Sequence, residues 1–165
     1  MSLSIRPLEA AELPAVCDAL VSRLAATHAR RLERQDRGGF MYLIAWADGE
    51  PAGFVGLGFP DGRDVNDLCE FRGLPLVSDL LVEPAFRGHG IGRALMEALE
   101  AAARDEGAIG VALDTGTSDD FAAARRLYRS MGYVDGAGVF LGGWSDPERS
   151  GLHLVDPLTI WRKTF

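Results

Sequence analysis

A short glycine-rich segment is the part of the sequence best suited to chemistry. It runs Arg87-Gly88-His89-Gly90-Ile91-Gly92 and is followed by Arg93. Glycines remove side chains where the backbone turns, so several N–H groups can converge on one point. If a helix begins here, its unpaired N–H groups and partial positive charge favour a bound phosphate. The two arginines can add charge-assisted hydrogen bonds. The segment therefore predicts a phosphate or pyrophosphate site.

The residues on either side supply the elements that would position such a site. Leu74 to Val82 is almost continuously apolar, which is typical of a strand at the centre of a sheet. Ile91 to Glu106 has helical periodicity, and Gly107 is a suitable stop. We expect Arg93, Glu97, Glu100 and Arg104 on the exposed face of this helix, opposite a stripe formed by Ile91, Ala94, Leu95, Ala98, Leu99 and Ala102.

The remaining periodicities alternate between strand and helix. We expect strands at Ser4–Leu8, 40–47, 51–59, 109–114, 133–141 and 158–161, helical structure over about 10–35 and after 117, a hairpin turn at Asp48-Gly49, and loops at 60–72 and 142–156. Thr117 and Asp120 resemble a capping box at the start of the second helical region. This order predicts an α/β fold in which helices flank a mixed sheet.

Composition limits the classes of protein that fit. The chain has 165 residues, 47% of them hydrophobic, which suits a single domain over residues 1–165 with its own core. No apolar run approaches the ~20 residues needed to span a bilayer, and the N-terminal residues lack a signal-peptide pattern. Cys17 and Cys69 have no CxxC spacing, so we expect reduced thiols, a cytoplasmic location and no metal site.

The charge of the chain limits which partners it can bind. The net charge of −7 argues against nucleic acid as the main partner and suits a cationic amine. A local group of arginines is the exception, and a solvated helix face is the simplest interpretation of it. Its members are Arg23, Arg30, Arg31, Arg34 and Arg37.

Three phosphate-binding motifs compete for the glycine-rich segment. A Walker loop requires a Lys after its glycines, and none is present here. A dinucleotide-binding turn requires Gly or Ala where this sequence has Arg93, and it follows a first strand rather than a late one. The third is the Q/R-x-x-G-x-G/A signature of the GCN5-related N-acetyltransferases, which Arg87, Gly90 and Gly92 match.

The chain resembles that family beyond these six residues. LLVEPAFRGHGIGRALMEALE is similar to its central strand, phosphate turn and following helix, and Leu127 to Tyr133 is similar to its LYxxxGF/Y segment. The resemblance is specific over roughly residues 76–133. It implies the acyl-CoA N-acyltransferase fold, with a centrally splayed mixed sheet of about six to seven strands, and acetyl-CoA as co-substrate.

The resemblance also implies a set of cofactor contacts. Backbone groups of Leu80, Leu81 and Val82 would pair with the pantetheine arm beside a bulge in their strand. The pyrophosphate would lie on the turn formed by Arg87, Gly88, His89, Gly90, Ile91, Gly92 and Arg93, with His89 contributing its backbone. Family members often carry Asn where this sequence has Phe121, so that contact must be lost or supplied by a neighbour.

The family reaction is direct attack of an amine on the thioester, and three residues are candidates for it. Tyr128 is expected to act as the general acid that protonates the leaving thiolate. Asp79 is expected to hold the substrate ammonium or to accept its proton through water, and Glu83 is the other candidate base. Alternation along the strand places Asp79 and Glu83 on the same face as Leu81.

Two other functions stay open from the sequence. One is a non-catalytic module that binds or senses acyl-CoA, and the other is an enzyme that acetylates peptides or proteins rather than small amines. Glu148, Arg149 and His153 are loop residues that could contact substrate or face water. We expect neither nucleic acid nor membrane as a partner, and a homodimer is among the oligomeric states left open.

Overall fold

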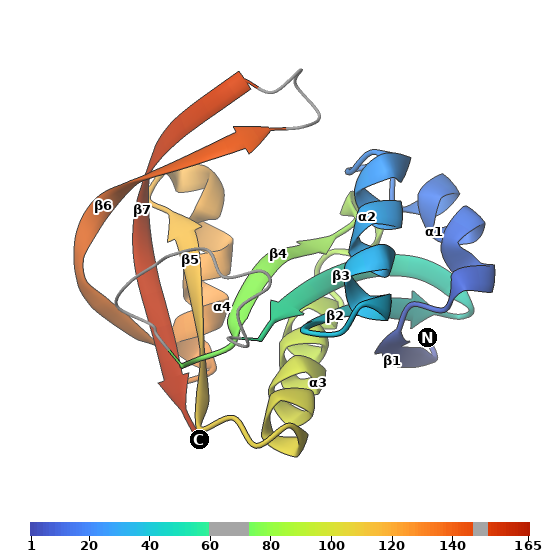
Figure 1. Ribbon diagram of the computed structural model, residues 1–165, viewed down its shortest axis with the longest axis horizontal. Coiled ribbons are helices and arrows are strands. Elements are labelled where there is room, and N and C mark those ends of the chain that lie inside the picture. The colour runs from blue at the N-terminus through green and yellow to red at the C-terminus, as the bar shows by residue number, and fades with distance from the viewer. Residues whose placement is uncertain (60–72, 147–151) are drawn as a thin grey trace. The chain divides into compact units, whose positions relative to one another are not determined.

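The structure is a computed structural model that describes residues 1–59, 73–146 and 152–165 (Figure 1). The chain divides into two compact units, Met1–Val111 and Ala112–Phe165. The single domain expected over residues 1–165 stays a prediction. The elements of the first unit are β1 (Leu3–Pro7), η1 (Ala10–Glu12), α1 (Leu13–Ala19), α2 (Ala25–Asp36), β2 (Phe40–Ala47), β3 (Glu50–Gly58), β4 (Leu76–Val82), η3 (Pro84–Phe86) and α3 (Ile91–Asp105).

The first unit is built on four antiparallel strands in the order β1-β2-β3-β4. The turn between β2 and β3 has positive φ at both central residues, 49° at Asp48 and 87° at Gly49. Two positive φ values define a type I′ turn, whose twist matches that of a hairpin. The predicted hairpin turn is therefore confirmed, and it sets the register of these two strands.

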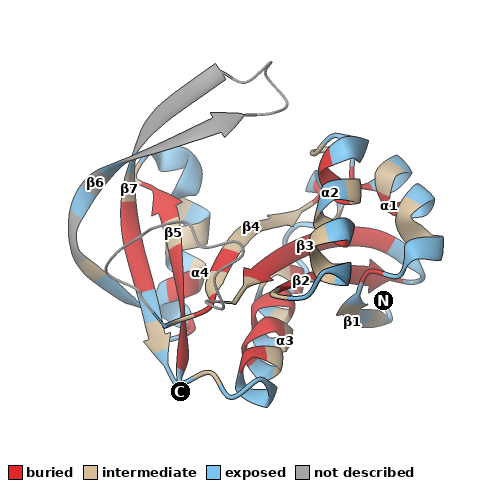
Figure 2. Ribbon diagram, in the orientation of Figure 1, coloured by how far each residue is buried: buried red, intermediate tan, exposed pale blue. Residues whose placement is uncertain are grey.

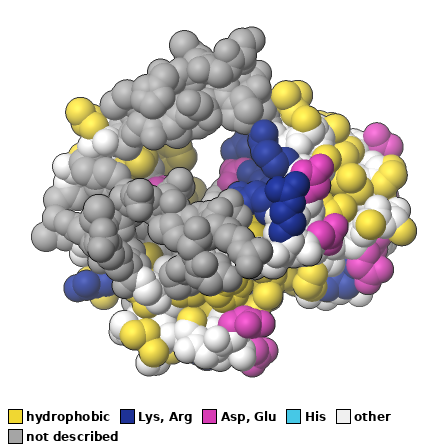
Figure 3. Space-filling model, viewed as in Figure 1, with side chains coloured by type: hydrophobic (Ala, Val, Ile, Leu, Met, Phe, Trp, Pro, Cys, Tyr) yellow, Lys and Arg dark blue, Asp and Glu magenta, His cyan; other side chains and the backbone are white. Residues whose placement is uncertain are grey.

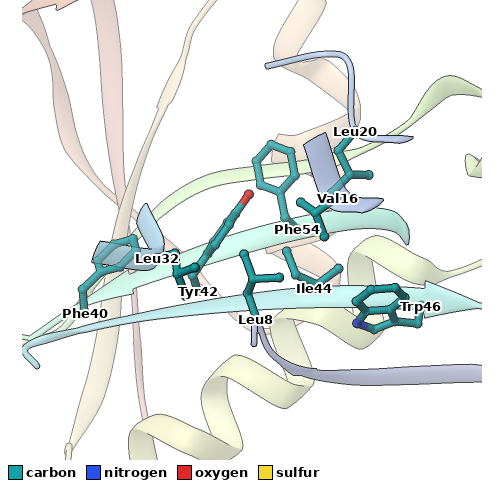
Figure 4. Packing of buried hydrophobic residues seen from close by; sticks show 9 residues of the cluster. All are labelled: Leu8, Val16, Leu20, Leu32, Phe40, Tyr42, Ile44, Trp46 and Phe54. Atoms are coloured by element: carbon teal, nitrogen blue, oxygen red, sulfur yellow. The ribbon is translucent and has the colours of Figure 1, made fainter. Parts of the chain in front are cut away.

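Residues of β2 that point to opposite faces are both buried, and Figure 2 colours buried residues red. Phe40, Tyr42, Ile44 and Trp46 alternate along the strand and belong to one cluster of nine residues, drawn in Figure 4. The other five are Leu8, Val16, Leu20, Leu32 and Phe54. The alternate residues, such as Leu43, face the other side, where α3 contacts β2, β3 and β4. The strand period of two therefore builds two layers of core.

The helical stretch expected over about residues 10–35 is interrupted. α1 ends at Ala19 and α2 begins only at Ala25. Leu20 leaves the helical conformation at ψ 61°, and its carbonyl accepts a hydrogen bond from Nε2 of the buried His28 at 3.0 Å. The expectation of helical structure over about residues 10–35 was therefore wrong between α1 and α2, where the bond from the His28 side chain to the Leu20 carbonyl stabilises the break.

α3 begins at Ile91, as expected, and Gly107 at φ 81° ends it. The Ala108 N–H donates to the Ala103 carbonyl and the Gly107 N–H to the Arg104 carbonyl, each at 2.9 Å, which is the Schellman pattern. Glu100 was wrongly assigned to the exposed face, since only 3% of it is exposed. It follows the buried Met96 by one turn, so the buried stripe is wider than apolar residues alone indicate.

The second unit contains most of β5 (Gly110–Gly116), then η4 (Asp119–Phe121), α4 (Ala122–Ser130), β6 (Val134–Asp146) and β7 (Leu152–Thr164). Its strand order is β5-β7-β6. β6 and β7 pair antiparallel from Val134 with Arg162 to Asp146 with Leu152. The loop expected over 142–156 was therefore wrong in part, because backbone pairing extends both strands into it. Glu148 and Arg149 lie outside the described residues, as does the side chain of His153.

The start of α4 also differs from expectation. No side chain of the described residues caps η4 or α4, so the capping box predicted from Thr117 and Asp120 is not formed. Arg125 instead holds the preceding turn from within the helix, donating from Nη1 to the carbonyls of Gly116 at 2.6 Å and Ser118 at 2.8 Å. The seven strands and four α-helices of the described residues confirm the predicted α/β class.

Candidate active site

β4 carries the predicted bulge. Phe54 of β3 pairs with Leu81 and Gly56 pairs with Ser78, so two β4 residues, Asp79 and Leu80, lie opposite Val55 alone. Asp79 has a φ of 50°, in the left-handed region that non-glycine residues rarely adopt. A bulge with one extra residue turns backbone groups out of the regular ladder. Leu80, Leu81 and Val82 follow it directly, which is where the cofactor-binding backbone was expected.

The bulge brings β4 unusually close to β3. A Cβ atom added to Gly53 would lie 2.6 Å from the Leu81 carbonyl oxygen and 3.1 Å from the Val82 Cα. Only glycine allows this approach without moving one of the two backbones. Gly53 therefore fixes the position of the strand segment to which the cofactor contacts are assigned.

Asp79 is bound by two arginines. Its carboxylate accepts from Arg23 Nε at 2.9 Å and Arg23 Nη2 at 2.6 Å, and also from Arg31 Nη2. Burial alone would raise the pKa of Asp79, but the hydrogen bonds and charges of Arg23 and Arg31 outweigh burial and lower it. The carboxylate is thus ionised and already neutralised, which makes it a poor proton acceptor.

Glu83 lies at the end of the same strand and is 6% exposed. One of its oxygens accepts from the Ser22 backbone N–H at 3.0 Å and the other from Ser22 Oγ at 2.7 Å. Because Leu81 packs on the cluster of α1 and α2, these contacts place Asp79, Leu81 and Glu83 on one face of the sheet, as predicted. Two hydrogen bonds orient the Glu83 carboxylate and leave it further acceptor sites.

The glycine-rich turn leads from β4 through η3 into α3. Gly88 and Gly90 have φ values of 82° and 79°, and a Cβ placed at either would meet no non-neighbouring atom of the described residues within 4 Å. These glycines are needed for backbone conformation and not for space. The turn is exposed from Arg87 to Gly90, so its N–H groups can reach a ligand.

The N-terminus of α3 has the properties of an anion site. Gly90 is its N-cap, no side chain in the described part of the chain caps it, and its first turn contains no acidic residue. The first helical N–H groups, such as those of Ile91 and Gly92, have no carbonyl one turn earlier to accept from them. Together with the partial positive charge of a 15-residue helix, this arrangement fits a pyrophosphate.

The side chains around the turn offer less to a bound anion than its backbone N–H groups do. Arg87 folds back and donates from Nε to the Val82 carbonyl at 2.9 Å, which ties the turn to the end of β4. His89 is exposed, and its Nδ1 lies 3.3 Å from the Phe86 carbonyl oxygen. Arg93 lies 4.0 Å from Glu97 on the exposed face of α3. Leu80 to Arg93, to which the cofactor contacts are assigned, thus run from the bulged end of β4 through the glycine-rich turn into α3.

Tyr128 belongs to the second unit and is 6% exposed. Its ring packs against Tyr133 at 5.8 Å and Trp161 at 6.3 Å between centroids. The Tyr133 N–H donates to the Tyr128 carbonyl at 3.0 Å and the Gly132 N–H to the Arg129 carbonyl at 3.1 Å, a second Schellman motif. The LYRSMGY segment thus encodes a helix end that fixes the Tyr128 backbone.

Sequence reasoning missed four candidate residues. Ser22 gave no signal, and Arg23 and Arg31 were assigned to a solvated face although the Arg31 side chain is only 13% exposed. Charge balance was the available clue, since Asp79 required a partner among apolar neighbours. Asp114 on β5 was also missed. Burial raises the pKa of this carboxyl, which has no polar partner among the described residues.

No group of three or more His, Cys, Asp or Glu side chains among the described residues is placed to hold a metal ion. Among the helices in the same part of the chain, none has the length and apolar character needed to cross a membrane. Cys17 is a free thiol, and burial raises its pKa.

Known proteins that are similar to this chain in sequence or structure identify its family. The model of the acetyltransferase (GNAT) family matches residues 5–133. An aminoglycoside N(6')-acetyltransferase type 1 of Stenotrophomonas maltophilia is 31% identical over 100 residues. That match covers 61% of this chain and 63% of the relative, so it spans less than two thirds of the relative's length.

Solved structures share the fold over nearly the whole chain. A ribosomal-protein-alanine N-acetyltransferase from Brucella melitensis superposes with a TM-score of 0.72 at 24% identity, covering 98% of this chain and 99% of that one. A putative acetyltransferase from Salmonella typhimurium, solved with its cofactor acetyl-CoA, gives 0.70 at 22% identity and covers 99% and 94%. These likenesses confirm the predicted acyl-CoA N-acyltransferase fold. Because the family model matches more than half of the chain, the chain belongs to the acetyltransferase (GNAT) family, as the sequence predicted.

Proposed function

We propose that this protein transfers an acetyl group from acetyl-CoA to the primary amine of a small molecule, by direct attack in a ternary complex. The observation that carries the proposal is the N-terminus of α3, which is uncapped and free of acidic residues beside a bulged strand. An aminoglycoside acetyltransferase among the relatives supports a small-molecule acceptor.

In this proposal the cofactor binds to backbone. The N–H groups from Gly88 to Arg93 hold the pyrophosphate, and Leu80, Leu81 and Val82 pair with the amides of the pantetheine arm. Arg87 keeps the two segments together through its bond to the Val82 carbonyl. Backbone recognition of this kind is pre-organised, because the glycine conformations and the bulge exist before the ligand binds.

The chemistry requires one proton acceptor and one proton donor. The amine nitrogen attacks the thioester carbonyl carbon, the C–S bond breaks, the new ammonium loses a proton, and the thiolate gains one. We assign proton removal to Glu83, directly or through water, because Ser22 orients its carboxylate while Asp79 is neutralised by Arg23 and Arg31. Tyr128 is assigned to protonate the thiolate.

The test is acetyl-CoA-dependent release of free thiol over a panel of small amines, amino acids, aminoglycosides and short peptides. Thiol release with small amines, lost in Glu83→Gln, is the expected result. Activity on peptides alone would establish the peptide acetyltransferase instead. Acetyl-CoA binding without turnover of any acceptor would establish a non-catalytic acyl-CoA-binding module.

A further inference from the structure

Asp114 is a carboxyl side chain set in an otherwise buried strand. Every other residue of β5 is buried, whereas Asp114 keeps partial exposure. No hydrogen bond or ion pair joins its carboxyl to a residue that the structure describes, and burial raises its pKa. A carboxylate in this position is costly, because burial removes water that no other group replaces. Local costs of this kind are typical of residues kept to bind a ligand.

The face of β5 that carries Asp114 also carries Gly116. Side chains alternate between the two faces of a strand, so residues 114 and 116 point to the same side, about 7 Å apart. A Cβ atom added to Gly116 would lie 2.4 Å from Cδ2 and 2.5 Å from Cε2 of Phe121. The Phe121 ring therefore occupies the space over Gly116, on the side to which Asp114 points.

The Phe121 ring is packed on one side and open on another. It is 45% exposed although it lies against Gly116. Arg125 donates to the carbonyls of Gly116 and Ser118, which fixes the turn between β5 and η4 that places the ring. The face of an aromatic ring attracts cations, so the open side of Phe121 can contact one.

A carboxylate and an aromatic ring on one face are the groups that recognise an organic ammonium ion. The carboxylate accepts charge-assisted hydrogen bonds, and the ring adds a cation–π contact. The net charge of −7 also favours a cation. On the face shown in Figure 3, Lys and Arg side chains gather mainly near α2, in the first unit, whereas Asp and Glu side chains lie at several places.

Asp114 and Phe121 belong to the same unit as Tyr128, the proposed general acid. Arg125 lies one turn before Tyr128 on α4, so its bonds to the Gly116 and Ser118 carbonyls join the helix of Tyr128 to the end of β5. A nitrogen that attacks the thioester needs its lone pair and must be neutral. An ammonium group held by a carboxylate is therefore not the attacking nitrogen, and the acceptor must carry a second amine.

We propose that Asp114 and Phe121 bind an ammonium group of the acceptor other than the amine that is acetylated. The acceptor is then a diamine or a larger molecule with at least two amines. This inference rests on the proposed acetyltransferase function and narrows its substrate class.

The experiment compares α,ω-diamines with amino alcohols of the same chain length as acceptors, at saturating acetyl-CoA and over a series of chain lengths. Each pair shares the reacting amine, and only the diamine has a second ammonium group. At the best chain length we expect kcat/KM for the diamine to exceed that for the amino alcohol about tenfold or more, the factor for a hydrogen bond between charged groups.

Variants assign this preference to the site. Asp114→Asn keeps the size of the side chain and removes its charge, so it should lower the ratio of the two kcat/KM values about tenfold, mainly by raising KM for the diamine. Any advantage that the diamine owes to a larger neutral fraction or to its two equivalent amines would persist in this variant. Phe121→Leu should lower the ratio about two- to fivefold through loss of the cation–π contact.

Asp120→Asn is the matched control, because it removes the same charge from an exposed residue of η4 next to Phe121. It should leave the ratio of the two kcat/KM values unchanged. Both Asn variants should keep the wild-type affinity for acetyl-CoA, measured by calorimetric titration.

The outcomes separate this inference from the proposed function. Turnover of acceptors with a single amine, amino alcohols included, at a kcat/KM equal to or above that of every diamine would overturn the ammonium site and keep the acetyltransferase. An equal loss for diamine and amino alcohol in Asp114→Asn would also overturn it, as would the same drop of the ratio in Asp120→Asn. No thiol release with any amine, amino acid or peptide would instead refute the proposed function.

Discussion

Gly53→Ala tests whether the close approach of β3 and β4 shapes the cofactor site. The new methyl carbon would lie 2.6 Å from the Leu81 carbonyl oxygen, about 0.8 Å inside the 3.4 Å at which ordinary contact begins. The obstacle is backbone on both sides, so no side chain can rotate away. Overpacking of this kind costs about 1–3 kcal/mol.

The expected change in melting temperature follows from that cost. For a chain of this size each kcal/mol corresponds to about 2–4 °C, so Gly53→Ala should melt about 2–12 °C below wild type. Relief of the overlap requires β4 to move at Leu81 and Val82. Acetyl-CoA affinity, measured by calorimetric titration below the melting temperature, should therefore fall about tenfold, the factor for loss of one or two backbone hydrogen bonds.

Gly56→Ala is the matched control in the same strand. Its methyl would meet side chains, the Phe40 ring at 2.6 Å and Ser78 Oγ at 2.7 Å, and not the β4 backbone. We expect a loss of stability with acetyl-CoA affinity retained. A wild-type melting temperature and affinity in Gly53→Ala would refute this role of Gly53, as would an equal loss of affinity in both variants.

Three further changes have defined outcomes. Tyr128→Phe should lower kcat about 100-fold with little effect on acetyl-CoA affinity, and unchanged turnover would exclude it as the general acid. Asp114→Asn should raise the melting temperature at pH 7, because a carboxyl whose pKa is raised in the folded state destabilises the wild-type protein as pH rises. The gain should vanish below the ordinary carboxyl pKa of 3.8. A variant less stable than wild type at pH 7 would contradict this prediction. Gly132 has a φ of 84°, so Gly132→Ala should lower the free energy of unfolding by about 1–2 kcal/mol. Asn tolerates this conformation, so Gly132→Asn should melt close to wild type. Equal melting temperatures of the two variants would contradict the role of Gly132 at the helix end.

Local patterns predicted the parts of the fold that local physics determines. The Asp48-Gly49 turn, the start of α3 at Ile91 and the glycine stop at Gly107 all follow from backbone conformations that few residues adopt. The glycine-rich segment was predictable for the same reason. These features depend on neighbours within a few residues, which a sequence displays directly.

Features set by distant contacts were not predictable. The break after α1 depends on His28 reaching back to the Leu20 carbonyl, and the start of α4 depends on Arg125 rather than on a capping box. Partners of Asp79 come from residues 48 and 56 positions away in the sequence. Only the packing of α2 against the sheet turned an apparently solvated arginine into a buried one.

The most direct test of the central claim compares acetyl-CoA with S-acetyl-pantetheine, which has the same thioester and arm but no pyrophosphate. At about 100 times its dissociation constant, acetyl-CoA should stabilise the protein by about 2.7 kcal/mol, which corresponds to about 5–10 °C in melting temperature. S-acetyl-pantetheine at the same concentration should give little shift, because it cannot reach the α3 N-terminus. No shift with millimolar acetyl-CoA, or an equal shift with both compounds, would contradict the assignment of the pyrophosphate to the Arg87–Arg93 turn.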